Sequence, residues 1–372
     1  MKYYLIAGEA SGDLHGSFLM RSLKKADPEA QFRYYGGDKM QAEGGELASD
    51  YREGAIMGFV SVLLHLPTIM RRMRACKDDI AQWKPDLVIL IDYPGFNLQI
   101  AKFVKENSIC PIYYYIPPKI WAWKEHRVKY IKRYVDRVFC IFPFEVDFYA
   151  KHGYTAEYVG NPSVDSVSHA QPVNRADFLR RNQLPDKPII AILPGSRKQE
   201  VQSGLPIFRQ INRSLFEGYQ FVVGASNAVD KALYDNAGFD LVWDDAYGLL
   251  QHADMAIVNS GTATLETALF NVPQVVCYQL PAKYISYPII YGMLLKIKYV
   301  SLVNIIAGKE TVKELLAYHF TAENVQTELL QILKCDAHRQ TILDDYQRIR
   351  EKLTTQVASE TAALKIIESL KH

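Results

Sequence analysis

Residues 85–97 read PDLVILIDYPGFN. The five apolar residues at 87–91 follow a Pro-Asp pair without a polar interruption, which is typical of a parallel strand buried on both faces. Asp92 ends the run, a Pro-Gly turn follows, and residues 96–104 have the apolar spacing of a helix. A strand, a tight turn and a helix in this order predict an α/β fold built on parallel strands.

The same alternation continues along most of the chain. Residues 16–25 have helical spacing, and further apolar runs predict strands at 3–7, 112–116, 137–141, 188–193, 219–223, 255–258 and 274–278. A polar stretch at 162–187 separates the two series and is the expected linker. We therefore predict two Rossmann-like domains facing a cleft, residues 1–165 and 166–340, with right-handed crossovers.

The chain after residue 322 is expected to be wholly helical. Near its end, Ile342, Tyr346, Ile349 and Leu353 follow the spacing of one apolar helix face. The last segment, 341–372, is expected to pack back on the N-terminal domain or on a partner subunit.

Composition narrows the class of protein. The 372 residues exceed the roughly 250–300 at which a single core stops growing. A net charge of +2 gives little electrostatic basis for nucleic-acid binding. The five cysteines are widely spaced, with no CxxC pair and no zinc-site spacing. We expect reduced cytosolic thiols, no metal and no cofactor.

No export signal or membrane span is expected. The first residues pass from a short apolar run into a glycine-containing turn, which predicts a strand and not a signal peptide. No stretch reaches the ~20 apolar residues that span a bilayer. Residues 287–307 come nearest, but Lys296 and Lys298 interrupt them. We therefore expect a cytoplasmic protein.

Polar and small residues follow the first predicted strand in the string AGEASGD, residues 7–13. Backbone N–H groups at this helix start could face an anion or a sugar hydroxyl, which makes Glu9, Ser11 and Gly12 candidates for a ligand cleft. The string is not GxGxxG, so a nicotinamide dinucleotide site is not indicated. An ordinary strand-to-helix turn with a helix cap fits the same residues.

Asp92 is the candidate general base. A carboxylate at the carboxyl end of a parallel strand projects toward the edge where α/β proteins bind ligands. Asn97, in the same motif, is a further candidate for that cleft. The alternative is that Asp92 is a turn or capping residue, which is common before Pro and Gly.

Two strings in the second half suit a nucleotide diphosphate. In LPGSR, residues 193–197, Gly195 and Ser196 precede Arg197, whose guanidinium can hold phosphate oxygens in pairs. In SGTATLE, residues 260–266, the start of a helix at Ser260, Gly261 and Thr262 offers free N–H groups, and Glu266 could accept from ribose hydroxyls. A surface arginine and a generic capping pattern are the alternatives.

Residues 57–73, MGFVSVLLHLPTIMRRM, combine an apolar run with a basic end. Such a segment can lie in a membrane interface, and it can equally form a buried helix pair joined at Pro67. The residues that would contact membrane or acyl chains are Phe59, Val60, Val62, Leu63, Leu66, Ile69 and Met70.

Taken together, these strings resemble the lipid-A-disaccharide synthase family from the first strand to about residue 320. The strings that carry the resemblance are AGEASGD (7–13), MGFVSVL (57–63), PDLVILIDYPGFN (85–97), WAW (121–123), FPFE (142–145), LPGSR (193–197), SGTATLE (260–266) and YVSLVNIIAG (299–308). The resemblance implies the glycosyltransferase B architecture. It also implies transfer of 2,3-diacylglucosamine from UDP to 2,3-diacylglucosamine 1-phosphate (lipid X), forming a β-1,6-linked disaccharide 1-phosphate.

The resemblance also implies roles for particular residues. Asp92 would be the essential carboxylate and Arg197 an essential donor contact, and Tyr299 and Asn304 would lie with SGTATLE in the UDP region. Residues 57–73 would receive acyl chains and dock a peripheral enzyme on the cytoplasmic face of the inner membrane. A homodimer is a further implication.

The chain departs from the family pattern at three positions. Gly95 stands where the family often has Asp, which leaves Asp92 as the carboxylate of that motif. Asn161 stands in place of a common His, and Gln279 in place of a basic residue. These departures bear on binding details more than on the class of reaction.

The expected mechanism is a single inverting displacement without metal. Asp92 takes the proton of the acceptor 6-hydroxyl, while Arg197 and the helix start at 260–262 hold the departing UDP. The alternatives are a UDP-sugar epimerase, a glycosyltransferase with a soluble acceptor, and a non-catalytic membrane-associated protein that binds nucleotide sugars.

Overall fold

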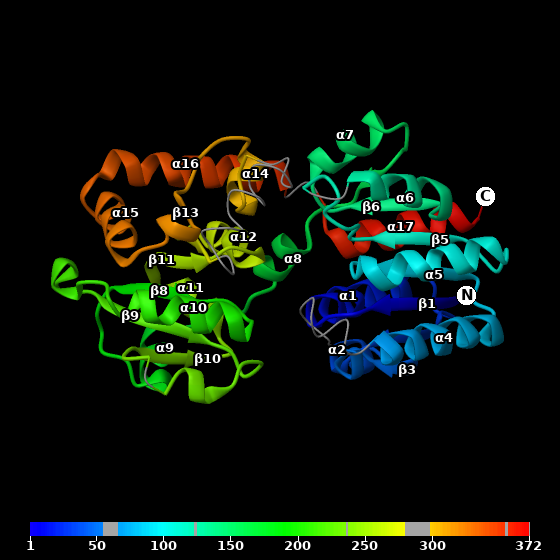
Figure 1. The fold of residues 1–372 in the computed structure, drawn as a ribbon, viewed down its shortest axis with the longest axis horizontal. Helices are drawn as coiled ribbons and strands as arrows, with labels where there is room; N and C mark the ends of the chain where they lie inside the picture. The colour runs from blue at the N-terminus through cyan, green and yellow to red at the C-terminus, as the bar shows by residue number, and fades with distance from the viewer. Residues whose placement is uncertain (55–65, 123–124, 236, 280–297, 354–355, 372) are drawn as a thin grey trace. The chain divides into compact units, whose positions relative to one another are not determined.

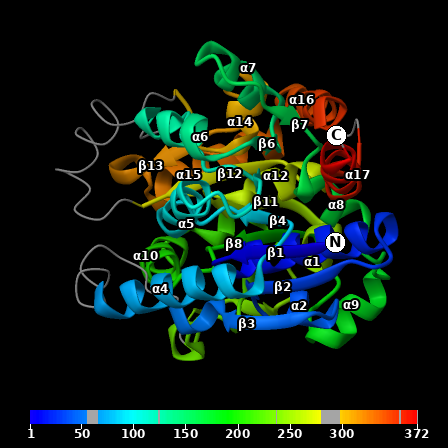
Figure 2. The same ribbon diagram turned by 90° about the vertical axis from the view of Figure 1, so that its right-hand side faces the viewer.

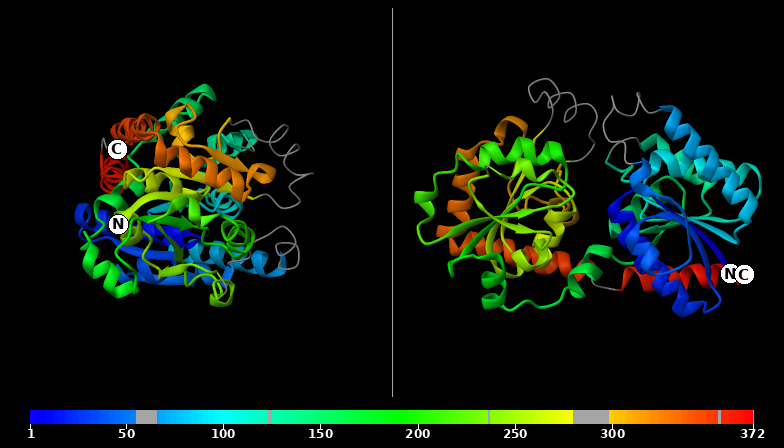
Figure 3. Two further views of the ribbon diagram at one scale, coloured as in Figure 1. Left: turned by 90° about the vertical axis from the view of Figure 1, so that its left-hand side faces the viewer. Right: turned by 90° about the horizontal axis from the view of Figure 1, so that it is seen from below.

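The structure is a computed structural model that describes residues 1–372 except 55–65, 123–124, 236, 280–297, 354–355 and 372. The described residues form two compact units, Met1–Pro162 with Leu353–His372, and Ser163–Lys352. Each unit is a parallel sheet with helices on both faces (Figures 1 and 3). The predicted α/β class is confirmed.

In the first unit, the described strands form a seven-stranded sheet in the order β3-β2-β1-β4-β5-β6-β7. Every pairing within it is parallel. The strands are β1 (Lys2–Ala7), β2 (Gln31–Gly36), β3 (Glu46–Asp50), β4 (Leu87–Ile91), β5 (Ile112–Tyr115), β6 (Arg137–Cys140) and β7 (Glu157–Tyr158). The register pairs Ala7 with Ile91 and Ile91 with Tyr115, so the three central strands end at one level.

Alternation along the central strands builds one core on each face of this sheet. Successive side chains of a strand point to opposite faces. Tyr3 and Leu5 accordingly belong to the core under α1 (Ala10–Ala26) and α17 (Ala358–Leu370), and Tyr4 and Ile6 to the other core. That second face is covered by α4 (Leu66–Trp83), α5 (Pro94–Glu106) and α6 (Val128–Tyr134), as Figure 2 shows. The unit also contains α2 (Asp38–Ala42), α7 (Pro143–Lys151) and the 3₁₀ turns Tyr51–Gly54 and Glu125–Arg127.

The C-terminal helix α17 completes the first unit. Its Ala362, Ala363 and Ile366 are buried in the core beneath α1, and the Ser22 hydroxyl donates to Ser359 at 3.3 Å. The preceding helix α16 (Asp336–Leu353) belongs to the second unit through Lys352. The single segment 341–372 of the sequence analysis therefore spans parts of two helices, of which α17 lies against the N-terminal strands.

In the second unit, the described strands form a six-stranded parallel sheet in the order β10-β9-β8-β11-β12-β13. The strands are β8 (Ile189–Leu193), β9 (Gln220–Ala225), β10 (Asp240–Trp243), β11 (Ala253–Asn259), β12 (Gln274–Tyr278) and β13 (Glu314–Leu316). The helices are α8 (Pro162–Ser168), which begins at the boundary, α9 (Arg175–Asn182), α10 (Lys198–Phe208), α11 (Ala246–His252), α12 (Thr262–Leu269), α14 (Leu302–Ala307), α15 (Ala322–Lys334) and α16, with 3₁₀ turns at Arg213–Phe216, Lys231–Leu233 and Ala317–His319.

The described helices were compared with the length and hydropathy of a membrane-spanning helix. Within the described parts of the chain, no helix combines the length and the apolar character that crossing a bilayer requires.

Candidate active site

The carboxyl ends of the three central strands of the first unit carry the ionisable groups of the candidate site. Glu9 follows β1, Asp92 follows β4 and Lys119 follows β5. Because β1, β4 and β5 are neighbours and end in register, these residues start from one edge of the sheet. This is the edge at which open α/β sheets bind ligands.

The backbone at Asp92 has an uncommon conformation. Asp92 and Tyr93 both have left-handed torsions, with φ of 45° and 47°. The Asp92 N–H donates to the carbonyl of Ile116 at 3.2 Å, and the Asp92 carbonyl accepts from the Tyr114 hydroxyl at 2.5 Å. Two consecutive left-handed residues other than glycine are strained and persist where their surroundings hold them, as happens at functional sites.

Asn97 is one of the groups that hold this turn. Its side-chain amide donates to the carbonyls of Asp92 at 2.8 Å, Ile91 at 3.2 Å and Ile6 at 3.3 Å. The residue has no exposed surface. The sequence analysis gave Asn97 as a candidate for the ligand cleft; in the structure its side chain is buried beneath the turn and holds it through these three bonds.

Gly8 fits against the same turn. A Cβ at Gly8 would lie 2.2 Å from Cγ of Tyr93, so the strand end and the Tyr93 ring approach more closely than any side chain permits. The Tyr93 ring stacks on Phe96 with centroids 5.4 Å apart. This close approach is the physical reason for glycine after the first strand.

The electrostatic surroundings make Asp92 a stronger base than an ordinary aspartate. Burial is the main cause that raises the pKa of Asp92, and the neighbouring Glu9 charge raises it further. Lys119 and the Tyr93 N–H act in the opposite direction. A carboxylate with a raised pKa accepts a proton more readily, which suits a general base.

The other candidate residues of the AGEASGD string differ in how exposed they are to solvent. Glu9 caps α1 through its extended backbone, and no described hydrogen bond to that cap uses its carboxylate. Ser11 is exposed. Gly12 is buried, and a Cβ there would lie 3.1 Å from the Ala7 Cβ, so Gly12 lets α1 pack closely against the end of β1.

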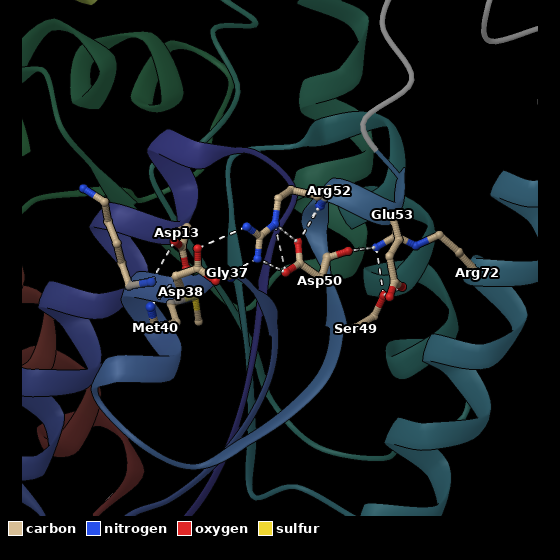
Figure 4. Close-up of polar contacts among 10 residues, drawn as sticks. Asp13, Gly37, Asp38, Met40, Ser49, Asp50, Arg52, Glu53 and Arg72 are labelled. Carbon is tan, nitrogen blue, oxygen red and sulfur yellow. Dashed lines mark hydrogen bonds and ion pairs between the residues drawn. The ribbon is translucent and has the colours of Figure 1, made fainter. Parts of the chain in front are cut away.

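Asp13 and Arg72 organise the neighbouring edge of the sheet (Figure 4). The buried Asp13 carboxylate accepts from the N–H groups of Gly37 at 2.7 Å and Met40 at 3.1 Å, which caps the start of α2. The Arg72 guanidinium donates to the Ser49 hydroxyl and to the Asp50 carbonyl, each at 3.1 Å. These contacts tie α2 and α4 to the ends of the outer strands.

In the second unit, β8 and β11 are neighbours with Leu193 opposite Val258. The strings LPGSR and SGTATLE follow these two strands, so the fold brings the two predicted donor motifs to one edge. Gly195 has φ of 109°, and a Cβ there would lie 2.2 Å from a carboxylate oxygen of Glu200. The turn therefore wraps around Glu200.

Arg197 stands at the start of α10. Its main-chain N–H and its Nη1 both donate to the Glu200 carboxylate at 3.2 Å. The side chain is 57% exposed, and Ser196 beside it is exposed as well. Arg197 is thus oriented by Glu200 and accessible to an anion.

The helix start after β11 is open. Gly261 caps α12, Gly261 and Thr262 are exposed, and a Cβ on Gly261 would meet no described atom within 4 Å. Ser260 lies at the same end and its Oγ is 3.5 Å from the Val300 carbonyl. Burial raises the pKa of Glu266, one turn into the helix, while a hydrogen bond with Tyr247 lowers it.

Asn304 differs from the expectation. It has no exposed surface, its amide donates to the Val312 carbonyl at 2.8 Å and to Glu314 at 2.9 Å, and its Oδ1 accepts from Thr311 and Val312 N–H groups. The family resemblance implies that Asn304 lies in the UDP region; in the structure its polar side-chain atoms bond to other residues of the protein. Tyr299, three residues before the N-terminal end of α14, is partly exposed.

Glu314 was missed by sequence reasoning. Its carboxylate accepts from the N–H groups of Val300 and Ser301, each at 2.9 Å, and from the Ser301 hydroxyl at 2.7 Å. It therefore holds residues 300–304 beside Ser260. A lone glutamate in a three-residue strand carries no sequence signal for this role.

The expected membrane residues are only partly described. Phe59, Val60, Val62 and Leu63 lie outside the described residues, and Leu66 begins α4. Ile69 is half-buried, and Met70 is 65% exposed.

The three departures from the family pattern have different surroundings. Gly95 is exposed, and a Cβ there would meet no described atom within 4 Å, so a larger side chain would fit. Asn161 is buried and its amide donates to the Ile141 carbonyl at 3.0 Å. Gln279 has a buried Oε1 that finds no hydrogen-bond donor among the described residues.

Comparison with known proteins bears on this arrangement. The family model described as lipid-A-disaccharide synthetase matches residues 3–367. The lipid-A-disaccharide synthase of Syntrophus aciditrophicus (strain SB) is 38% identical over 99% of this chain and 97% of its own length. That of Myxococcus xanthus (strain DK1622) is 37% identical over 98% and 97%.

Solved structures share the fold at low identity. A UDP-GlcNAc 2-epimerase from Neisseria meningitidis, bound to UDP-GlcNAc, superposes with a TM-score of 0.65 at 10% identity over the full length of both chains. The calicheamicin glycosyltransferase CalG4 gives 0.58 at 14% identity, over 99% of this chain and 98% of its own. These likenesses support the glycosyltransferase B fold. The family model and the two relatives show that the chain belongs to the lipid-A-disaccharide synthase family and is a glycosyltransferase of lipid A biosynthesis.

Proposed function

We propose that the chain transfers 2,3-diacylglucosamine from UDP-2,3-diacylglucosamine to the 6-hydroxyl of 2,3-diacylglucosamine 1-phosphate. The products are the β-1,6-linked disaccharide 1-phosphate and UDP. The observation that carries the mechanism is Asp92, a carboxylate with a raised pKa on a strained and firmly held turn at the ligand edge of its sheet.

The proposed chemical step is one displacement. The acceptor O6 attacks the anomeric carbon of the donor, the bond from that carbon to the β-phosphate oxygen breaks, and UDP takes the bond electrons. Asp92 receives the proton of the 6-hydroxyl as the new bond forms. Attack from the face opposite the leaving group inverts the anomeric centre.

The proposed donor site uses the second unit. Arg197 is accessible and oriented by Glu200, so its guanidinium can pair with the diphosphate. The open helix start at Gly261 and Thr262 offers main-chain N–H groups to the same charge, and Glu266 is suited to ribose hydroxyls. These donors stabilise the charge that develops on UDP as it leaves.

We also propose that the enzyme is peripheral on the cytoplasmic face of the inner membrane. Both proposed substrates carry acyl chains, and the exposed Met70 with the arginines of α4 suits an interface of lipid tails and phosphates. The family resemblance leads us to propose a homodimer as well. Vesicle flotation tests the first point and light scattering the second.

The reaction is tested by incubating the protein with both lipid substrates in mixed micelles containing a chelator, and by following UDP and disaccharide with mass spectrometry. Disaccharide and UDP in equal amounts support the proposal. An interconverted UDP-sugar without an acceptor would support an epimerase. Binding of UDP with no release from any substrate pair would support a non-catalytic protein.

A further inference from the structure

Lys119 lies beside the candidate base, in the turn that follows β5. Because Ile91 pairs with Tyr115 and the Asp92 N–H donates to the Ile116 carbonyl, this turn starts next to Asp92. Lys119 is three positions after Ile116 in the sequence, which keeps their Cα atoms within about 11 Å of each other. A lysine side chain can cover much of that distance.

The backbone of this turn is fixed on both sides of Lys119. Pro117 and Pro118 are buried and restrict their own φ angles, and Ile120 is buried directly after Lys119. The Ala122 N–H donates to the Lys119 carbonyl at 3.1 Å. Lys119, between these buried neighbours, is exposed. Its backbone is thus held in place while its side chain is free to reach a ligand.

A second contact anchors the far end of the turn. The Trp121 indole N–H donates to the Glu145 carboxylate at 3.0 Å, and that carboxylate also accepts from the N–H groups of Ile141 and Phe142. Glu145 is almost fully buried. Through Trp121, the turn after β5 is therefore anchored to the start of α7.

The Lys119 ammonium group is uncommitted. It forms no hydrogen bond or ion pair with any residue in the described part of the chain, although Asp92 and Glu145 both feel its charge. Arg72, another cation of this unit, already donates to Ser49 and Asp50 and lies over the Tyr35 ring. Lys119 is therefore the better-placed cation for an anionic ligand.

We propose that Lys119 binds the phosphomonoester of the acceptor and selects for it. The inference rests on the proposed function, in which the acceptor 6-hydroxyl meets Asp92 and the phosphate is on C1, on the other side of the ring oxygen from C5, which carries the 6-hydroxymethyl group. A lysine on the neighbouring strand end supplies a mobile point charge with three donors, which suits a phosphate at that distance. The contact would place the 6-hydroxyl and exclude sugars without the phosphate.

The test compares two acceptors and three enzymes. The acceptors are 2,3-diacylglucosamine 1-phosphate and its dephosphorylated form, and the enzymes are the wild type, Lys119→Ala and the control Lys151→Ala, an exposed lysine at the end of α7. We expect Lys119→Ala to lower kcat/KM about tenfold or more for the phosphorylated acceptor, mainly through its KM, and much less for the other. The donor KM should stay unchanged, and Lys119→Arg should restore most of the loss.

Other outcomes would overturn the inference. Equal losses with both acceptors would mean that Lys119 acts on Asp92 alone, and a raised donor KM would assign Lys119 to the UDP phosphates. If the wild type does not turn over the dephosphorylated acceptor, the two KM values of Lys119→Ala are compared. A raised KM for the phosphorylated acceptor with an unchanged donor KM supports the inference, and a raised donor KM contradicts it. A wild type that makes no disaccharide would instead refute the proposed function and leave these comparisons without a reaction.

Discussion

The side-chain amide of Asn97 donates a hydrogen bond to the main-chain carbonyl of Asp92 at 2.8 Å. The same amide reaches the carbonyls of Ile91 and Ile6, so one buried side chain joins two central strands to the turn that carries the candidate base. The Asn97 side chain therefore helps to hold the left-handed torsions at Asp92 and Tyr93. We infer that Asn97 determines where the Asp92 carboxylate lies.

Asn97→Ala is expected to lower both activity and stability. It leaves three buried carbonyls without this donor, at a cost of about 1–3 kcal/mol. It should lower kcat more than it raises either KM, because the base is displaced while substrate contacts remain. Asn107→Ala is the control, since the Asn107 amide also donates to a main-chain carbonyl but is exposed. Urea unfolding and initial rates measure the two effects; equal effects of both variants would contradict the positioning role.

The raised pKa of Asp92 predicts the acidic limb of the rate profile. The carboxylate acts as a base when ionised, so kcat/KM, which reports the pKa of the free enzyme, should fall as the pH falls through a pKa above the ordinary 3.8. Lys119→Met should move this limb to higher pH, because the positive charge of Lys119 lowers the pKa of Asp92. Rates at acceptor concentrations well below KM across the pH range measure the shift. A limb at the same pH in both enzymes would rule out this coupling.

Glu145 should make stability depend on pH in a defined direction. Burial is the main cause that raises the pKa of Glu145 from 4.5 to about 7, despite its three hydrogen bonds. Its contribution to stability is present below its unfolded pKa and is lost as the pH rises toward 7, because ionising the buried group costs free energy. The loss should be no more than about 3 kcal/mol.

Glu145→Gln tests this linkage. The variant should be less stable at low pH, because it loses a hydrogen-bonded cap, but its stability should no longer fall between pH 4.5 and about 7. Chemical unfolding at several pH values provides the curve. An identical slope for the wild type and the variant would show that Glu145 does not titrate in this window.

Arg197→Ala should damage use of the donor without affecting folding. The side chain is exposed and pairs with Glu200 on the surface, so its removal should change stability by less than about 1 kcal/mol. Loss of its pairing with the diphosphate should raise the donor KM or lower kcat by at least about tenfold. Arg180→Ala is the matched control, because Arg180 is exposed and pairs with Asp177 three residues away in the same unit. Comparable kinetics for the two variants would remove Arg197 from the donor site.

The sequence predicts the central parts of the molecule better than its edges. The strands β1, β4, β8 and β11 are continuous apolar runs because helices cover both faces of each sheet, and all were predicted. The strands β2, β3, β7, β10 and β13 were missed. They are short or carry charged residues, as in QFRYYG and ELL, because they lie toward the sheet edges.

The sequence predicts a site residue well when that residue follows a predicted strand. It predicts poorly the residues whose role depends on being buried. Asp92, Arg197 and Ser260 lie within four residues of the ends of predicted strands, so their edge of the sheet follows from topology. Asn97 was a cleft candidate from its motif, and Asn304 was expected near UDP from the family resemblance. Both are buried and bind main-chain groups, which depends on packing that one sequence does not encode locally. Lys119 follows two prolines in a loop, where no periodic pattern reveals its neighbours.

The most direct test of the account is disaccharide formation by Asp92→Asn. Asparagine keeps the shape of the side chain and removes the base, so turnover should fall by about 10²-fold or more while UDP still binds as in the wild type. Asp147→Asn, on the exposed face of α7, should behave as the wild type does. Mass spectrometry of the product and UDP titration by calorimetry measure both quantities. Near-normal disaccharide formation by Asp92→Asn would contradict the assignment of Asp92 as the base.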